Sequence, residues 1–190
     1  MKNLALLLLA GVVAQGAPPD WKVTVYVQNN AEVPFEVRLL AQGLATQMFG
    51  QIGVKLAFPP GRPRGQALNR RVVVELVDKT PPDFQPGALA YATPYEGQHI
   101  RIFYDRMGTA NPSAMFSLLA HVLVHEISHL LEGTSWHSDH GIMKAKWTGD
   151  DLAQMRRGPL GFTDEDIRLI HSGLNAAAMP LGPEAAAATR

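Results

Sequence analysis

The stretch from His121 to Met143, HVLVHEISHLLEGTSWHSDHGIM, constrains this chain more than any other part of its sequence. It holds five of the seven histidines. Three of them, His121, His125 and His129, follow one another at intervals of four residues. On a helix that spacing places the side chains on one face, a turn apart, where neighbouring imidazoles can reach a common ion. The pattern therefore predicts a long helix with a histidine-bearing face and raises the question of a metal site.

Within this stretch, His125, Glu126 and His129 form the pattern H-E-x-x-H. In this arrangement two imidazoles bind zinc, and the glutamate beside the first of them acts as general base. The pattern lies inside a predicted amphipathic helix that begins at Asn111-Pro112 and runs to about Glu132. We therefore predict one catalytic zinc ion bound by His125 and His129, with Glu126 as the general base.

A catalytic zinc ion usually has three protein ligands and an open position, so a third ligand must follow His129. A residue further along the helix would leave the ion, and the chain must first turn. Gly133 provides that turn, because glycine readily adopts the left-handed conformation that ends a helix. His137 is then the natural third ligand, and His140 and Asp139 stay open as alternatives.

The segment resembles the metzincin clan of zinc peptidases, whose signature is H-E-x-x-H-x-x-G-x-x-H followed by a turn that carries a methionine. Here Gly133 lies eight residues and His137 twelve residues after His125, which makes the pattern HExxHxxxGxxxH. Two extra residues thus separate the helix from the third ligand, and Ser135 at the usual position is not a ligand. The resemblance implies that Met143 is the methionine packed beneath the metal ligands.

Two further segments resemble the matrixin-like members of the clan. WHSDHGIM is similar to their GHS…LM stretch, and GFTDEDIRLIHSGL is similar to their closing helix, LTxxDixaIqxLYG. The resemblance covers most of residues 21–175. It implies a metzincin-like zincin domain with a mixed twisted sheet, an active-site helix, an N-terminal helix and a C-terminal helix. It also implies a zinc endopeptidase that acts on a peptide or protein substrate.

The chain departs from the clan in one further respect. Certain metzincins use a tyrosine shortly after the methionine turn, whereas this chain has no tyrosine after Tyr104. Stabilisation of an oxyanion would then fall to the ion and to nearby backbone groups. A gluzincin-type site would instead take Glu165 as a ligand, but the acidic run around it is more typical of the first turn of a helix.

The remaining patterns predict an α+β fold with one sheet backed by helices. Two of the expected strands flank the turn PYEGQ and are predicted to form a hairpin. An irregular segment is expected between the second and the final helix. The predicted strands are 21–28, 54–58, 71–77, 88–93 and 99–105, and the predicted helices are 33–50, 111–132 and 162–174.

The two ends of the chain differ in composition from its middle. Residues 1–16, MKNLALLLLAGVVAQG, have a basic start, an apolar stretch and small residues at the cleavage position, which is typical of a signal peptide. We therefore expect export to the periplasm or medium, with no stable membrane association after cleavage. The domain is predicted over 17–178, followed by a disordered Ala/Pro-rich tail at 179–190. With no cysteine, packing and metal binding must stabilise it.

Charge limits the classes of partner. Lys+Arg and Asp+Glu are equal at 17 each, so there is no basic excess for a nucleic acid backbone. A second function class stays open, a non-catalytic exported binding module stabilised by a closed zinc site with His140 or Asp139 as fourth ligand. The sequence leaves the oligomeric state open.

Other segments have predicted roles around the site. ALAYAT or HIRIFYD is expected to supply the sheet edge to which an extended substrate adds as a strand. His121 is expected to pack or hydrogen-bond behind the metal ligands, and His99 and His171 are expected to be structural.

Overall fold

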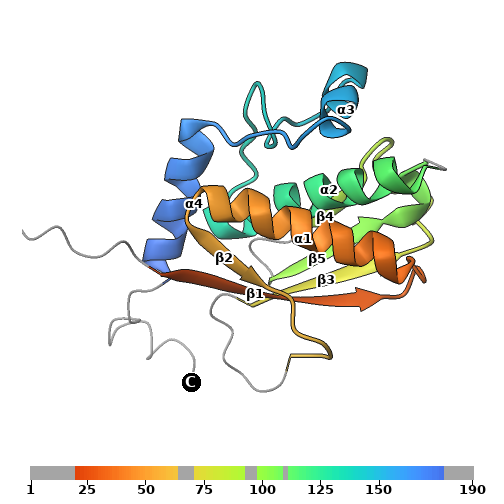
Figure 1. Ribbon diagram of the computed structural model, residues 1–190, viewed down its shortest axis with the longest axis horizontal. Coiled ribbons are helices and arrows are strands. Elements are labelled where there is room, and N and C mark those ends of the chain that lie inside the picture. The colour runs from red at the N-terminus through yellow and green to blue at the C-terminus, as the bar shows by residue number, and fades with distance from the viewer. Residues whose placement is uncertain (1–19, 64–70, 93–97, 109–110, 178–190) are drawn as a thin grey trace, which may run out of the picture.

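A computed structural model of the chain describes residues 20–63, 71–92, 98–108 and 111–177. The predicted signal peptide at 1–16 and the predicted tail at 179–190 lie outside the described residues. The described part contains one sheet with helices on one of its faces (Figure 1). The predicted α+β class, with an N-terminal helix, a central helix and a C-terminal helix, is confirmed.

The sheet has five strands in the order β2-β1-β3-β5-β4. The first four in that order run parallel to one another, and β4 at the edge pairs antiparallel with β5. The predicted hairpin pairing is therefore confirmed, although most of its connecting turn lies outside the described residues. The strands are β1 (Trp21–Asn29), β2 (Val54–Ala57), β3 (Arg71–Val77), β4 (Ala90–Ala92) and β5 (His99–Phe103).

Buried and more exposed side chains alternate along the strands, and the buried ones lie on the face of the sheet that the helices cover. On β1, Trp21, Val23 and Val25 are buried, and the residues between them are exposed or half-buried. On β5, Ile100 and Ile102 are buried in the same way. These apolar side chains form a common core with the helices, as a sheet with one covered face requires.

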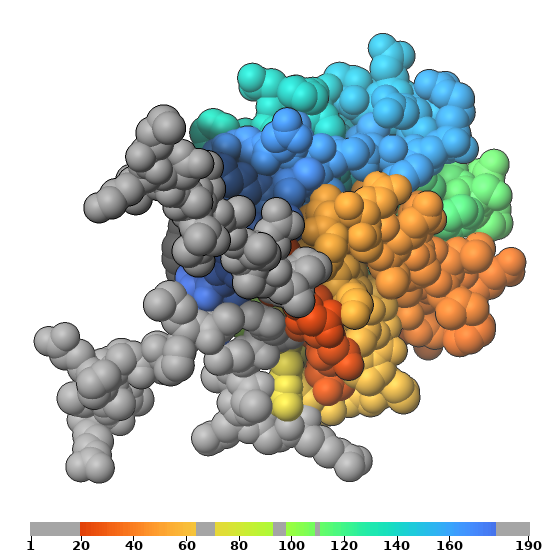
Figure 2. Space-filling model, turned by 60° about the vertical axis from the view of Figure 1, so that its left-hand side comes forward, coloured from red at the N-terminus to blue at the C-terminus, as the bar shows by residue number. Residues whose placement is uncertain are grey.

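Four α-helices and one 3-10 turn complete the described elements. α1 and α2 lie side by side over the sheet, and α4 lies at one end of them (Figure 1). In the space-filling view the light-blue segment that holds α3 lies above α1 (Figure 2). The elements are α1 (Phe35–Gln51), η1 (Tyr104–Arg106), α2 (Pro112–Glu132), α3 (Gly149–Met155) and α4 (Asp164–Ala176).

The ends of α2 follow the signals in the sequence. The Asn111 side chain accepts a hydrogen bond from the Ser113 N–H, and Pro112 occupies the first helical position. Gly133 ends the helix with a φ of 67°, in the left-handed region. In length and apolar composition α2 alone among the described helices would suffice to cross a membrane, but 78% of that stretch is buried within the fold.

The C-terminal end of α2 is held tightly against α4. A Cβ atom placed on Gly173 of α4 would lie 1.8 Å from the Leu131 carbonyl oxygen. Only glycine permits so close an approach between the two helices. Packing against α4 therefore fixes the last turn of α2, after which the chain continues toward His137.

The structure departs from the prediction most clearly at α3, at β4 and at the end of β5, where Tyr104 and Asp105 lie in η1. The segment between α2 and α4 was expected to be irregular, but it contains α3, which begins with a capping box between Thr148 and Asp151. The short T-x-x-D pattern was the signal for it, and the seven-residue helix lacks the apolar periodicity that marks longer ones. Strand β4 covers Ala90–Ala92 and begins two residues later than predicted, and Thr93 at its predicted end lies outside the described residues.

Candidate metal centre

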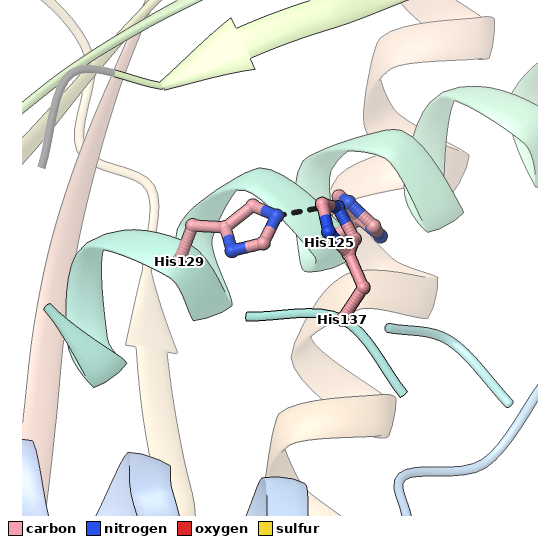
Figure 3. Close-up of side chains that lie close together, drawn as sticks. All are labelled: His125, His129 and His137. Atoms are coloured by element: carbon pink, nitrogen blue, oxygen red, sulfur yellow. Dashed lines mark hydrogen bonds between the residues drawn. The ribbon is translucent and has the colours of Figure 1, made fainter. Parts of the chain in front are cut away.

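Three histidines converge where α2 ends. His125 and His129 project from successive turns of α2, and His137 reaches them from the segment that follows the helix (Figure 3). Their nearest ring nitrogens all lie within 4.8 Å of one another. The Nε2 atoms of His125 and His129 are 3.1 Å apart. The structure thus brings together the three ligands predicted from the sequence.

These distances suit a zinc ion. Two nitrogens bound to one tetrahedral zinc at ~2.0–2.1 Å would lie about 3.3 Å apart. The observed separation of 3.1 Å between the Nε2 atoms of His125 and His129 is close to that value. Among the described residues no fourth histidine or carboxylate joins the group, so one position on a tetrahedral ion would stay open.

In His125 and His129, the hydrogen bond made by Nδ1 shows which ring nitrogen carries the proton. The Nδ1 of His125 lies 2.9 Å from the Ile142 carbonyl oxygen, and the Nδ1 of His129 lies 3.1 Å from the Thr134 carbonyl oxygen. A carbonyl oxygen only accepts, so both Nδ1 atoms must donate. In the neutral rings both Nε2 atoms then present lone pairs to each other. A cation between them removes this repulsion, and a hydrogen bond between the two Nε2 atoms does not fit these tautomers.

The segment after α2 delivers the third histidine. Ser138, next to His137, donates its backbone N–H to the Met143 carbonyl at 2.9 Å. Its hydroxyl donates to the buried carboxylate of Asp166, which also caps the first turn of α4. His137 is therefore held through its neighbour by both the following turn and α4, although it comes from a segment without regular structure.

The turn that carries Met143 also contacts the site. Ile142 offers its carbonyl to His125 and donates its N–H to the Gly161 carbonyl at 2.9 Å. Gly141 has a φ of 79°, and a Cβ there would lie 2.5 Å from the Gly161 oxygen, so the turn requires glycine. The Met143 side chain is fully buried in the core one residue after the carbonyl that orients His125.

Burial keeps the three histidines neutral. It lowers the pKa of His125 to about 4, despite the hydrogen bond to Ile142. Burial, with His125 and His137 nearby, lowers the pKa of His129 to about 3. Burial also lowers the pKa of the half-buried His137. Because a metal binds only the neutral imidazole, the site needs no deprotonation of these rings at neutral pH.

Glu126 follows the first ligand on α2 and is 8% exposed. Burial raises the pKa of its carboxyl to about 8, with no positively charged group offsetting it. Without a metal the side chain is therefore mostly protonated at neutral pH. A cation bound close to this carboxyl would favour its charged form.

His121 and Trp147 support the helix that carries His125 and His129. His121 is fully buried, donates from Nδ1 to the Ser117 carbonyl at 2.7 Å, and accepts at Nε2 from the Leu160 N–H at 3.0 Å. Trp147 places its ring edge-to-face with both His121 and His125, at centroid distances of 6.3 and 5.5 Å. His121 thus ties α2 to the segment before α4, which is the supporting role expected of it.

The rival ligands lie elsewhere. His140 and Asp139 are exposed and are not part of the histidine group. Glu165 is also exposed and pairs with Arg168 at 2.5 Å. His171 donates from Nε2 to the Ile52 carbonyl at 2.8 Å and packs against Trp21, as a structural histidine would.

Two supporting residues were not anticipated from the sequence. Asp166 belongs to the capping box of α4 and also accepts a hydrogen bond from Ser138, beside His137. Trp147 packs edge-to-face with His125. Neither contact has a signal in local sequence, because each joins residues more than twenty positions apart.

Comparison with known proteins places this geometry within a known fold. No family model and no curated relative matches the chain. An archaemetzincin from Methanopyrus kandleri superposes with a TM-score of 0.54 at 17% identity, over 86% of this chain and 99% of that one. A zinc-dependent peptidase from Methanocorpusculum labreanum gives 0.55 at 12% identity, over 77% and 99%. An archaemetzincin from Archaeoglobus fulgidus gives 0.54 at 15% identity, over 78% and 100%.

At these identities the likeness is one of fold. The chain has the fold of the archaemetzincin structures, with its sheet and helices matched over most of both lengths. The predicted metzincin-like architecture is therefore confirmed at the level of the fold.

Proposed function

We propose that this chain is an exported zinc-dependent endopeptidase of the metzincin clan with matrixin-like features. The observation that carries the proposal is the convergence of the three histidines, with the Nε2 lone pairs of His125 and His129 facing each other 3.1 Å apart. The solved structures that share the fold support it, since one of them is described as a zinc-dependent peptidase. Export rests on the signal-like sequence of residues 1–16.

Each residue of the site has a task in this reaction. His125, His129 and His137 bind one ion and leave a position open. When bound, zinc supplies Lewis acidity, which acidifies water and polarises a carbonyl group. Glu126 accepts the proton of the attacking water at its carboxylate and returns it to the leaving amine. The carbonyls of Ile142 and Thr134 hold two of the rings in the tautomer that offers Nε2.

The substrate would bind along an edge of the sheet. Of the two strands expected to bind it, β4 lies at an edge of the described sheet and β5 does not. The Phe103 N–H donates to the Leu89 carbonyl, so in this antiparallel register Leu89 and Tyr91 point their backbone groups toward β5. Ala90 and Ala92 therefore point their backbone N–H and C=O groups outward. An extended peptide can pair with these two residues as an additional strand.

The alternative is a binding module in which zinc has only a structural role. Such a site is closed by a fourth protein ligand. His140 and Asp139, the residues expected to close it, are exposed and outside the described histidine group. A buried Glu126 with a raised pKa also has no task in a structural site. Both observations favour the peptidase.

Metal analysis tests the proposal first. The mature chain, His137→Ala and the matched control His140→Ala are purified in parallel, and zinc per chain is measured. We expect about one zinc in the wild type and in His140→Ala, and a weakened or lost ion in His137→Ala. Loss of zinc in His140→Ala instead would assign the third ligand to that residue.

Activity is then measured on a mixture of unstructured peptides, with the products identified by mass spectrometry. We expect internal cleavage by the wild type, and a loss of about a hundredfold or more in Glu126→Gln that still binds zinc. A zinc-loaded wild type that cleaves no peptide, or a Glu126→Gln variant with full activity, would contradict the proposed peptidase.

A further inference from the structure

The edge strand β4 is short within the residues that the structure describes. There it pairs with β5 through Ala90, Tyr91 and Ala92, next to the hydrogen bond from the Phe103 N–H to the Leu89 carbonyl. Strands of this length are at the lower limit found in proteins, and an edge strand has a neighbour on one side only. Something besides the ladder must keep Ala90 and Ala92 in place for a peptide to pair with them.

The loop that leads into β4 is hydrogen-bonded to η1, the 3-10 turn that follows β5. The Asp105 carboxylate accepts hydrogen bonds from the Thr80 N–H at 3.2 Å and from the Thr80 hydroxyl at 3.0 Å. Arg106 contacts the other end of this loop, close to β4. η1 therefore contacts both the start and the end of the segment between β3 and β4.

Arg106 makes the larger set of contacts. Its guanidinium donates to three backbone carbonyls of the loop, those of Gln85 at 2.7 Å, Ala88 at 2.9 Å and Phe84 at 3.3 Å. Within the described ranges it forms no ion pair with a carboxylate. Its charge is therefore directed at the main chain of the loop that ends at β4. The planar guanidinium group carries several N–H donors and is suited to bind several carbonyls at once, whereas the ammonium group of a lysine is not.

Aromatic packing connects this clamp to β4 itself. The Arg106 guanidinium carbon lies 5.9 Å from the Phe84 ring centre and 5.5 Å from that of Phe103. Tyr91, the middle residue of β4, packs against both rings at 5.1 and 5.9 Å. Arg106 thus contacts both the loop backbone and the cluster in which the side chain of β4 is anchored.

We propose that Arg106 is a positioning residue for the substrate, because it holds the Phe84–Ala88 loop and through it the free edge formed by Ala90 and Ala92. The inference rests on the proposed function and deepens it. Arg106 does not touch the substrate or the ion. It acts by keeping this edge in a fixed position against α2, the helix that carries His125 and His129.

The test compares Arg106→Lys with Arg168→Lys, a matched change at an arginine that pairs with Glu165 on α4. Hydrogen exchange of the 84–92 segment is followed by mass spectrometry without substrate. We expect about tenfold faster exchange in Arg106→Lys, since the ammonium group cannot replace all three hydrogen bonds, and no change in Arg168→Lys. Unchanged exchange in Arg106→Lys would overturn the inference whether or not the chain is a peptidase.

Kinetics on the zinc-loaded variants supply the second readout. For a hexapeptide that spans β4, we expect KM to rise about tenfold in Arg106→Lys with kcat nearly unchanged, because the lost interaction serves binding alone. A blocked dipeptide, which reaches the ion but not the edge, should show no difference. Faster exchange with an unchanged KM would overturn the positioning role, and a wild type that cleaves neither peptide would overturn the proposed function along with it.

Discussion

Substituting the buried Glu126 with glutamine should reveal how much the burial of this carboxyl destabilises the metal-free fold. Burial raises the pKa of this carboxyl to about 8, from an ordinary value of 4.5. Between these two values the folded chain holds a proton that the unfolded chain has released. The free energy of unfolding therefore falls as pH rises through this window.

The magnitude follows from the two pKa values. Linkage gives a destabilisation of about 2 kcal/mol at pH 6 and about 4 kcal/mol at pH 8 from this one carboxyl. Glu126→Gln has no such titration but keeps the size and shape of the side chain. The difference in unfolding free energy between variant and wild type should therefore grow, in favour of the variant, by about 2 kcal/mol between pH 6 and pH 8.

Urea denaturation followed by circular dichroism, with excess chelator at both pH values, measures this difference. Glu132, whose pKa is also raised to about 8 by burial, is present in both proteins and cancels from the comparison. Asp20→Asn is the control, because pairing with Lys55 lowers the pKa of that exposed carboxyl and leaves it ionised throughout the range. A difference that stays the same at pH 6 and pH 8 would refute the reasoning about Glu126.

Three further outcomes follow from the geometry. Gly173→Ala should lower the unfolding free energy by about 2 kcal/mol or more, because its Cβ would meet the Leu131 carbonyl at 1.8 Å; an unchanged urea midpoint would contradict this. Ser138→Ala removes the hydroxyl that binds Asp166 and should weaken zinc binding about tenfold in a chelator competition, whereas the exposed Ser135→Ala should not. Since burial lowers the pKa of His125 to about 4, the metal-free chain should lose stability as pH falls from 6.5 toward 4, and His125→Gln should show a shallower loss in the same urea series.

The elements with strong local signals were predicted well from the sequence. The α2 helix begins at its Asn-Pro cap and ends at Gly133, because cap chemistry and the left-handed glycine act within a few residues. The parallel strands follow from their apolar, β-branched runs. The short α3 was missed because seven residues contain a cap but are too few to show an apolar periodicity.

The site itself was predictable only in part. The spacing of His125 and His129 is a property of one helix, so it can be derived without knowledge of the rest of the fold. The approach of His137 depends on contacts with α4 and with the turn at Met143, which local sequence does not encode. That His137 rather than His140 binds the ion stays a prediction for metal analysis to test. The role of β4 as the free edge likewise required the strand order, because two strands had equal claim in the sequence.

The two ring-orienting acceptors at the metal centre have an evolutionary consequence. Both belong to the main chain, at Ile142 and Thr134, rather than to side chains. A point mutation can change either side chain, but it leaves the carbonyl oxygen in place unless the backbone moves. The tautomers of His125 and His129 therefore do not depend on which side chains these two positions carry, although core packing constrains the fully buried Ile142. What selection must preserve is the path of the backbone, through glycines such as Gly141 that admit no substitute.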